Sequence, residues 1–238
     1  MGGPARRDVR EFLDTPGQDP RELRLLLGDI RRANRRYGGS RLVLRHLTAI
    51  TAAIPRRPLT LLDVASGGAD VPLRVVEWAA ARRIQLRIVA VDVNPDVLEA
   101  AGEKTKARDE VRLVRADALA LPFPDGTFDI VTCGLTLHHF SLEGGALALR
   151  EIDRVAREAF VVNDIVRSWA GYAGAWLDTR LFARSRLARH DGPVSVLRAF
   201  TVPELRRMIA LAGLNGVKIV PHPLFRVALV RRPRGIPS

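Results

Sequence analysis

Residues 59–70, which read LTLLDVASGGAD, decide the fold of this chain. An apolar run rich in Leu and Val ends in an acidic residue and then in small residues, and a helix is expected to begin at Asp70. This order is typical of a buried parallel strand that turns tightly into a helix, the place where open α/β sheets bind nucleotides. Gly67 and Gly68 lack a Cβ, so a ligand can approach the backbone closely. Asp63 stands at the carboxyl end of the strand, where we expect it to accept hydrogen bonds from a ligand amine.

The composition indicates one α/β domain. The chain has 238 residues, of which 47% are hydrophobic, enough to bury a sizeable core. It contains no apolar run of about 18 residues that would predict a transmembrane span, and its first residues lack the apolar region of a secretory signal. Cys133 is the single cysteine, which excludes an intramolecular disulfide and favours a cytoplasmic protein with this thiol in the core.

The net charge of +12 raises the question of a nucleic-acid partner. Nearly all of the positive charge is arginine, and it is scattered over most predicted helices without interleaved aromatic residues on one stretch. A nucleic-acid substrate is therefore not expected. Attraction to anionic substrates, or a peripheral contact with a membrane surface, remains open.

The residues before the central strand predict an arm and a lid. Residues 1–18 are polar and rich in Gly, Pro and Arg, and we expect a flexible arm. Asp19 and Pro20 then predict the start of an amphipathic helix that Gly38 stops, and a second such helix runs to Pro55. Residues 19–58 are expected either to form a helical lid over the ligand edge of the sheet or simply to pack against the domain.

Strands and helices alternate through the rest of the chain. This pattern predicts a Rossmann-like, mostly parallel sheet of seven strands with an antiparallel last strand. Expected strands are 59–64, 86–91, 111–116, 128–133, 159–165, 217–220 and 225–230, and expected helices are 70–83, 96–108, 141–158 and 201–213.

Polar residues follow several of these strands. Asp92 ends the second strand, where a carboxylate is placed to grip both hydroxyls of a ribose; since Asn94 already supplies a helix cap, capping alone is the less favoured interpretation. Asp117 follows the third strand and can accept from the exocyclic amine of an adenine. His138 and His139 follow the fourth strand, and Asp164 ends the fifth.

These motifs together resemble those of class I S-adenosylmethionine (SAM)-dependent methyltransferases, over roughly residues 59–230. The motifs are Asp63-x-Ala-x-Gly-x-Ala69, Asp92, Asp117-Ala118, the loop PFPDGTFD and LHHF. Within the family the resemblance is to the small-molecule branch with quinone-biosynthesis and polyketide-phenol methyltransferases. One departure is that Ala65 and Ala69 replace two glycines of the usual first loop.

The resemblance implies SAM as cofactor and assigns its binding residues. Asp63 and the backbone at Ala65, Ser66 and Gly67 would hold the methionine moiety. Asp92 and Val93 would hold the ribose, and Asp117 and Ala118 the adenine. The domain would then span 59–238, with an acceptor-side insertion at about 166–200.

The insertion carries an aromatic stripe at helical spacing. Trp169, Tyr172 and Trp176, with Asp164, are the candidate substrate-binding residues, although such a stripe also suits a plain core. Residues 189–193 are expected to form a polar turn after this helix.

A phenol loses a proton on methylation, and histidine is suited to accept it. His139 and His190 are the candidate bases, and a hydrogen-bonded or exposed histidine is the alternative for each; His138 is expected to point into the fold or toward the cofactor. No metal site is expected, because no Cys or His stands at zinc-ligand spacing and Asp164 alone is weak support for magnesium.

The expected function is SAM-dependent methylation of an apolar aromatic small molecule, a phenol, resorcinol or quinone precursor, on oxygen in preference to carbon. The alternatives are methylation of tRNA or protein, or a non-catalytic scaffold that keeps the fold. The oligomeric state is left open.

Overall fold

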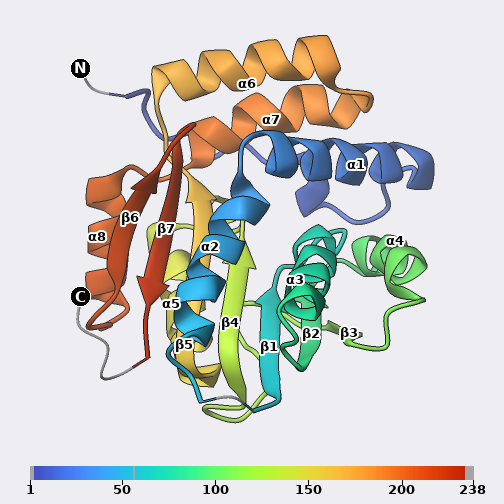
Figure 1. The fold of residues 1–238 in the computed structure, drawn as a ribbon. Helices are drawn as coiled ribbons and strands as arrows, with labels where there is room; N and C mark the ends of the chain where they lie inside the picture. Colours follow the sequence, from blue (N-terminus) through green and yellow to red (C-terminus); the bar gives the residue numbers. More distant parts are fainter. Residues whose placement is uncertain (1–2, 56, 234–238) are drawn as a thin grey trace.

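A computed structural model describes residues 3–55 and 57–233 and shows helices on both faces of a seven-stranded sheet (Figure 1). The strand order is β3-β2-β1-β4-β5-β7-β6, and β7 runs antiparallel to the other six strands. The predicted fold class is confirmed. The strands are β1 (Leu59–Val64), β2 (Leu86–Asp92), β3 (Val111–Arg115), β4 (Phe128–Gly134), β5 (Ala156–Ile165), β6 (Lys218–His222) and β7 (Arg226–Arg231). The helices are α1 (Pro20–Arg36), α2 (Gly39–Thr51), α3 (Asp70–Ala81), α4 (Pro95–Thr105), α5 (Leu142–Val155), α6 (Trp169–Phe182), α7 (Arg186–Arg198) and α8 (Val202–Leu211), with short 3-10 turns η1 (Phe12–Asp14) and η2 (Leu137–His139).

Strand β1 lies at the point where the strand order reverses. It pairs in parallel with β2 on one side and with β4 on the other, so that Val64 is level with both Val91 and Cys133. Loops that leave neighbouring strands here turn to opposite faces of the sheet, which opens a crevice at the carboxyl ends of the strands. The fold therefore brings together the segments that follow β1, β2 and β4.

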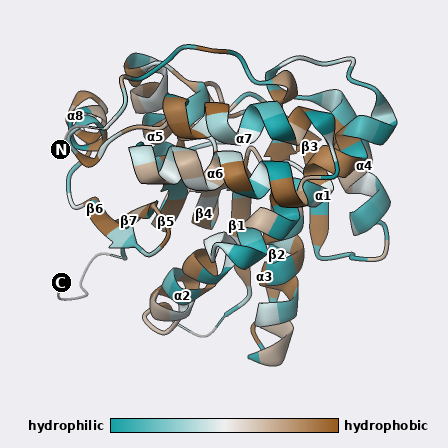
Figure 2. Ribbon diagram, turned by 90° about the horizontal axis from the view of Figure 1, so that it is seen from above, coloured by the Kyte–Doolittle hydropathy of each residue, from teal (hydrophilic) through white to brown (hydrophobic). Residues whose placement is uncertain are grey.

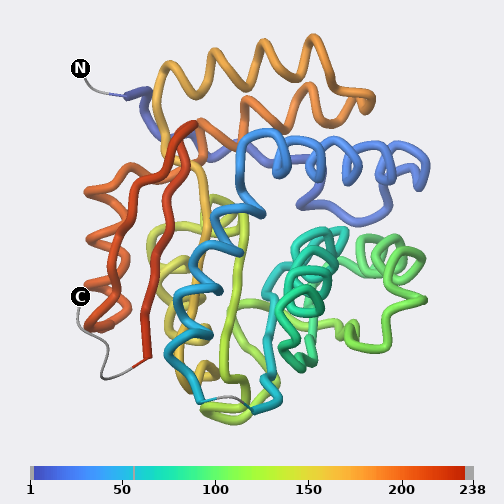
Figure 3. The backbone as a smooth tube through the Cα atoms, in the orientation of Figure 1, coloured from blue at the N-terminus to red at the C-terminus, as the bar shows by residue number. Residues whose placement is uncertain are grey.

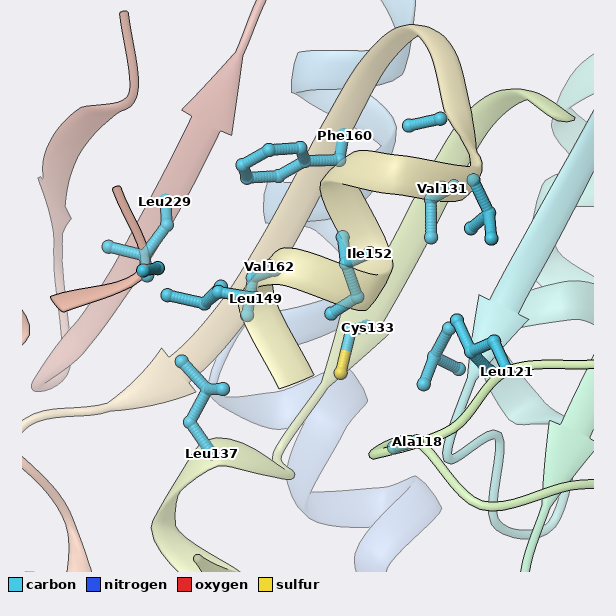
Figure 4. Close-up of a cluster of buried hydrophobic side chains, with 14 of the residues drawn as sticks. Ala118, Leu121, Val131, Cys133, Leu137, Leu149, Ile152, Phe160, Val162 and Leu229 are labelled. Atoms are coloured by element: carbon cyan, nitrogen blue, oxygen red, sulfur yellow. The ribbon is translucent and has the colours of Figure 1, made fainter. Parts of the chain in front are cut away.

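Alternate residues of the central strands feed two apolar cores. Val131 and Phe160 pack with α5 and α8 on one face (Figure 4). Ile130 and Val161 pack with α2 and α3 on the other. Cys133 is buried in the first core, as expected. This period-two alternation fixes the register of the sheet, because a slip of one residue would turn each apolar set to the wrong face.

A third layer of helices covers the carboxyl edge of the sheet. It consists of α1, α6 and α7, and the N-terminal segment runs beneath them (Figure 3). The segment is not a loose arm where it is described. Arg7 N donates to Leu197 O, and the Pro4 carbonyl accepts from the buried Arg167. Residues 1 and 2 of the expected arm lie outside the described residues.

Two predicted boundaries were wrong. Helix α5 ends at Val155 and not near residue 158, because Ala156 pairs with Phe128 as the first residue of β5. Residues 189–193 form no turn but lie inside α7, which Ser185 caps and which tolerates Pro193 in its interior. The sequence suggested a turn because Gly and Pro are adjacent there, yet long-range packing overrides that local signal.

Candidate active site

The loop after β1 takes an unusual backbone conformation. Ala65, Gly67 and Ala69 have φ angles of 51°, 55° and 57°, in the left-handed region that favours glycine. The two alanines that depart from the usual glycines thus keep the backbone path that glycine normally provides. The loop is held against β2 by Ser66 N, which donates to Val91 O at 2.9 Å.

Asp63 forms the floor of this loop. It is buried, its Oδ1 accepts from the Thr132 hydroxyl at 2.6 Å, and burial raises its pKa to about 7. No basic side chain forms an ion pair with it in the part of the chain that the structure describes. A buried carboxyl group of this kind is stabilised in its ionised form when a cation binds beside it, and an α-ammonium group would supply that cation.

Asp92 ties two loops together. One carboxylate oxygen accepts from Gly67 N at 2.9 Å and the other from Asn94 N at 3.0 Å. Burial is the largest influence on its pKa, which is raised. The carboxylate therefore stands where the β1 and β2 loops meet.

The remaining predicted cofactor residues lie along the same edge. Asp117 follows β3 and accepts from Leu119 N at 2.9 Å, while Ala118 is buried behind it and Val93 is exposed. Strand pairing places Asp92 level with Arg115, so the segments after β2 and β3 are neighbours. All eight predicted residues therefore lie at, or directly after, the carboxyl ends of β1, β2 and β3.

A histidine pair lies beside this edge, after β4. His138 is buried, and its Nδ1 lies 2.8 Å from Asp164 Oδ1. Burial would raise the pKa of Asp164, but His138 and hydrogen bonds lower it overall. Because an ionised carboxylate can only accept, the ring donates to Asp164 from Nδ1, and its second nitrogen, Nε2, points elsewhere. That Nε2 faces Glu11 Oε1 at 3.6 Å.

His139 has a carboxylate partner of its own. Its Nδ1 lies 2.5 Å from Asp14 Oδ1, and its ring centroid is 4.3 Å from that of His138. The buried Arg198 fixes this arrangement, since it bridges Asp14 and the His139 carbonyl. Burial would raise the pKa of Asp14, but the contacts with His139 and Arg198 lower it overall.

Glu11 lies next to His138 and also lines a cavity. Burial raises the pKa of Glu11 to about 7, and within the described part of the chain its Oε1 is buried without a hydrogen-bond partner. The cavity, of about 110 Å³, lies between η1, α1, α6 and α7. Its wall contains the apolar Leu13, Leu26 and Ile30, together with charged residues of both signs: Glu11, Asp29, Arg32, Arg36, Asp178 and Asp191. A buried carboxyl oxygen that accepts no hydrogen bond, at the wall of a cavity, is suited to bind a hydroxyl group.

The expectation of no metal site rested on local spacing, which could not include Glu11. Ligand atoms of Glu11, His138 and His139 lie within 4.8 Å of one another. Arg198 Nη1, however, lies 3.8 Å from Glu11 Oε1, and a guanidinium so close opposes a divalent cation. We propose no metal here.

The other predicted acceptor residues lie outside this cluster. His190 is on α7, its side chain is 41% exposed, and its Nδ1 lies 2.9 Å from Asp191 Oδ1. Trp169 and Trp176 are exposed on the outer side of α6, whereas Asp178 and Thr179 of that helix line the cavity. The aromatic stripe does not form the cavity wall. Trp169 and Asp178 are nine positions apart, and residues at this spacing lie on opposite sides of a helix. Tyr172 is partly buried and packs edge-on against Trp169.

Sequence reasoning missed Glu11, Asp14 and Arg198. The first two lie in a segment whose composition predicted a flexible arm, and Arg198 is one of many arginines. The FLD turn after Glu11, an apolar pair within a polar stretch, was the only local sign that this segment packs.

Comparison with known proteins identifies the family. A methyltransferase-domain family matches residues 62–159. The demethylmenaquinone methyltransferase of Thermus thermophilus is 33% identical over 184 residues, which cover 70% of this chain and 79% of the relative. The chain belongs to the class I SAM-dependent methyltransferases.

Solved structures of other methyltransferases share the fold. A SAM-dependent methyltransferase from Aquifex aeolicus superposes with a TM-score of 0.62 at 17% identity, over 90% of this chain and 98% of that protein. The structure called PigF with SAH gives a TM-score of 0.63 at 16% identity, over 94% and 63%. Membership of this family, shown by the relative from Thermus thermophilus, makes SAM the cofactor of this methyltransferase. The uncompensated Asp63, the left-handed loop and Asp92 at the loop junction fit its ammonium, carboxylate and ribose.

Proposed function

We propose that this methyltransferase transfers a methyl group to an apolar aromatic small molecule, a phenol, resorcinol or quinone precursor. The observation that carries the proposal is the cavity beneath α6, whose wall includes apolar side chains of η1 and α1, and where Glu11 Oε1 faces His138 Nε2 at 3.6 Å. A hydroxylated ring fits such a site, because its body packs on aliphatic side chains while its hydroxyl meets a polar group. The relative from Thermus thermophilus, named for demethylmenaquinone, supports the quinone class.

The reaction needs few chemical steps from the side chains of the protein. Bound SAM supplies a methyl group that is already activated by its positive sulfur, so the chain contributes position, water exclusion and proton uptake. Asp63, Asp92 and Asp117, with the loop at Ala65, Ser66 and Gly67, hold the cofactor in this proposal. The segment at Glu11 closes the site from above, where Asn94 Nδ2 donates to Leu13 O.

His139 is the proposed base. It is the more accessible of the two adjacent histidines, and Asp14 fixes its ring as a carboxylate fixes the imidazole of a catalytic triad. His138, which Asp164 orients, contacts both His139 and Glu11 in this cluster. His190 is the weaker candidate, because it does not belong to the group of Glu11, His138 and His139.

Transfer to oxygen is proposed in preference to carbon, because the polar groups at the cavity are placed to take a hydroxyl proton. A large acceptor such as tRNA is disfavoured, since Arg6, Arg167 and Arg198 use their positive charge within the fold, on backbone carbonyls and carboxylates. A non-catalytic scaffold is disfavoured, since the alanine-substituted loop keeps its left-handed path.

Product analysis tests the proposal. The purified chain is incubated with isotopically labelled SAM and a panel of phenols, resorcinols, quinols and bulk tRNA, and products are followed by mass spectrometry and NMR. We expect label in a hydroxylated aromatic compound, on oxygen, and none with the Asp63→Asn variant. Label on a ring carbon would correct the acceptor atom, and label in tRNA alone would refute the substrate class.

A further inference from the structure

Helix α6 carries large apolar side chains on its outer face and a charged side chain on its inner face. Its outward residues Trp169, Trp176, Leu177 and Leu181 are 60%, 44%, 52% and 64% exposed. Its inward side carries the polar Asp178, which accepts from the Tyr37 hydroxyl at 2.5 Å and from Arg36. Surface helices of soluble proteins normally show the opposite arrangement. The outer face of α6 is therefore not explained by packing within this chain.

The apolar surface continues past the start of α6. Phe225 O accepts from Val166 N just before the helix, and Gly171 in its first turn packs near the Phe225 ring. Leu224 and Phe225, at the tip of the β6–β7 hairpin, are 55% and 45% exposed. Figure 1 shows α6 as the outermost helix with this hairpin tip beneath one end, and Figure 2 views the outer side of α6, where apolar residues lie along the helix.

The exposed charged side chains on α6 and directly after it are arginines. Arg180 lies on the outer face with its guanidinium 5.0 Å from the Trp176 ring, and Arg36 packs over Phe182 at 4.2 Å. Arg184 and Arg186 follow the helix and are exposed. The single acidic residue of α6, Asp178, is turned inward and paired. An apolar surface that carries tryptophan and is edged by arginine matches the interface of an anionic bilayer.

We infer that the outer face of α6, with the hairpin tip at Leu224 and Phe225, is a docking surface for an anionic lipid membrane. The helix lies in the plane of the interface: α6 has 14 residues, and no helix among the described residues is long and apolar enough to cross a bilayer. Tryptophan and leucine side chains enter the boundary between headgroups and acyl chains, and the arginines meet lipid phosphates.

The position of α6 links this surface to the proposed reaction. Asp178, Thr179 and Ala183 line the acceptor cavity from the inner side of the helix and of the turn after it. One helix therefore separates the docking surface from the cavity, and an apolar acceptor dissolved in the membrane has a short route to it. This link rests on the proposed function, whereas the docking itself does not.

Vesicle binding without SAM or acceptor tests the inference. The full chain is sedimented with vesicles of phosphatidylcholine alone or with equal parts of phosphatidylglycerol. We expect binding to the anionic vesicles, weakened by salt, and a blue shift of tryptophan emission from Trp169 and Trp176, since Trp78 is already buried. The double variant Trp176→Ser/Leu177→Ser should lose at least about tenfold in partitioning, and Arg180→Glu should weaken binding to anionic vesicles alone.

The matched control is Leu147→Ser/Leu211→Ser, which removes two exposed leucines from α5 and α8 and should leave partitioning unchanged. Thermal unfolding and calorimetry with SAM show that each variant is folded, so a failure of docking is separable from a failure of the methyltransferase site. Equal loss in variant and control, or no binding by the unmodified chain, would overturn the inference. A concentration-dependent dimer that the α6 variant abolishes, without vesicle binding, would assign the surface to a second copy instead.

Discussion

At the carboxyl edge of the sheet, Asp63, Asp92 and Asp117 each lie at the end of a strand or within two residues of it. In the helical layer above, Glu11, Asp14 and Arg198 come from opposite ends of the chain, and the contact between the last two spans 184 residues. The first region is positioned by strand pairing, which brings neighbouring carboxyl ends to one edge whatever the side chains are. The second is positioned by specific side-chain contacts, so its geometry depends on each one. The two regions should therefore respond differently to substitution.

The largest effect is expected at Asp63, the best-buried group of the first region. Its pKa of about 7 lies above the value of 3.8 for an unperturbed aspartate. Without SAM, the unfolded chain releases this proton from about pH 4 upward while the folded chain keeps it to about pH 7, so stability falls over that window. Asp63→Asn should raise the free energy of unfolding at pH 8 by up to about 4 kcal/mol and flatten its pH dependence, as measured by denaturant titration.

The Asp63→Asn variant should also bind SAM much more weakly. An amide cannot neutralise an ammonium group, so we expect the dissociation constant in calorimetry to rise about 100-fold, on the order of 3 kcal/mol. For the unmodified chain, SAM binding should release a proton near pH 6, detectable as a buffer-dependent enthalpy. A variant that is no more stable and binds SAM normally would show that this carboxyl group faces no cofactor cation.

The next largest effect is expected at His139, in the second region, where a substitution should change kcat but not SAM affinity. His139→Gln should lower kcat by about 100-fold, as removal of a general base does, while SAM affinity changes less than about twofold. His190→Gln is the matched control, because that imidazole also has an aspartate neighbour but is more exposed. Steady-state kinetics on the acceptor found by product analysis measures both. A larger loss for His190 would reverse our choice of base.

The difference between the regions also explains what could be predicted from sequence. The strands, the β1 loop and the aspartates at the ends of β1, β2 and β3 follow from local patterns, because hydrophobic periodicity and strand ends are visible in short windows. The roles of Glu11 and Arg198 do not, because they depend on contacts between residues that are distant in the chain. The stripe from Trp169 to Trp176 was visible, but which side of the helix faces solvent is decided by what Asp178 and its neighbours contact.

A moderate effect is expected at Glu11, in the second region. Glu11→Gln keeps the shape but removes the negative charge that the carboxyl group acquires above its pKa of about 7. We expect kcat to fall about tenfold at pH 8, about 1.4 kcal/mol, and to differ less from the unmodified chain at pH 6, where most Glu11 is already neutral. A pH profile of kcat measures this. A uniform loss at all pH values would indicate that Glu11 only packs.

The smallest effect tests the backbone of the first region. Ala65 has a φ of 51°, a conformation that disfavours an L-residue by about 1–2 kcal/mol, while glycine loses roughly 0.4–1 kcal/mol through its freer unfolded state. Ala65→Gly should therefore raise the free energy of unfolding by about 0.5–1 kcal/mol and leave SAM affinity within about twofold.

Arg83→Gly is the matched control for this last variant. Arg83 is exposed, has a φ of 56° and lies between α3 and the amino end of β2, at the opposite edge from the carboxyl ends of the strands, so it should show a similar gain with no change in SAM binding. Denaturant titration and calorimetry measure both variants. If Ala65→Gly destabilises the chain while Arg83→Gly stabilises it, then the methyl group of Ala65 makes a contact that the loop needs. The alanine would then be a packing feature of this site, and not a tolerated replacement for glycine.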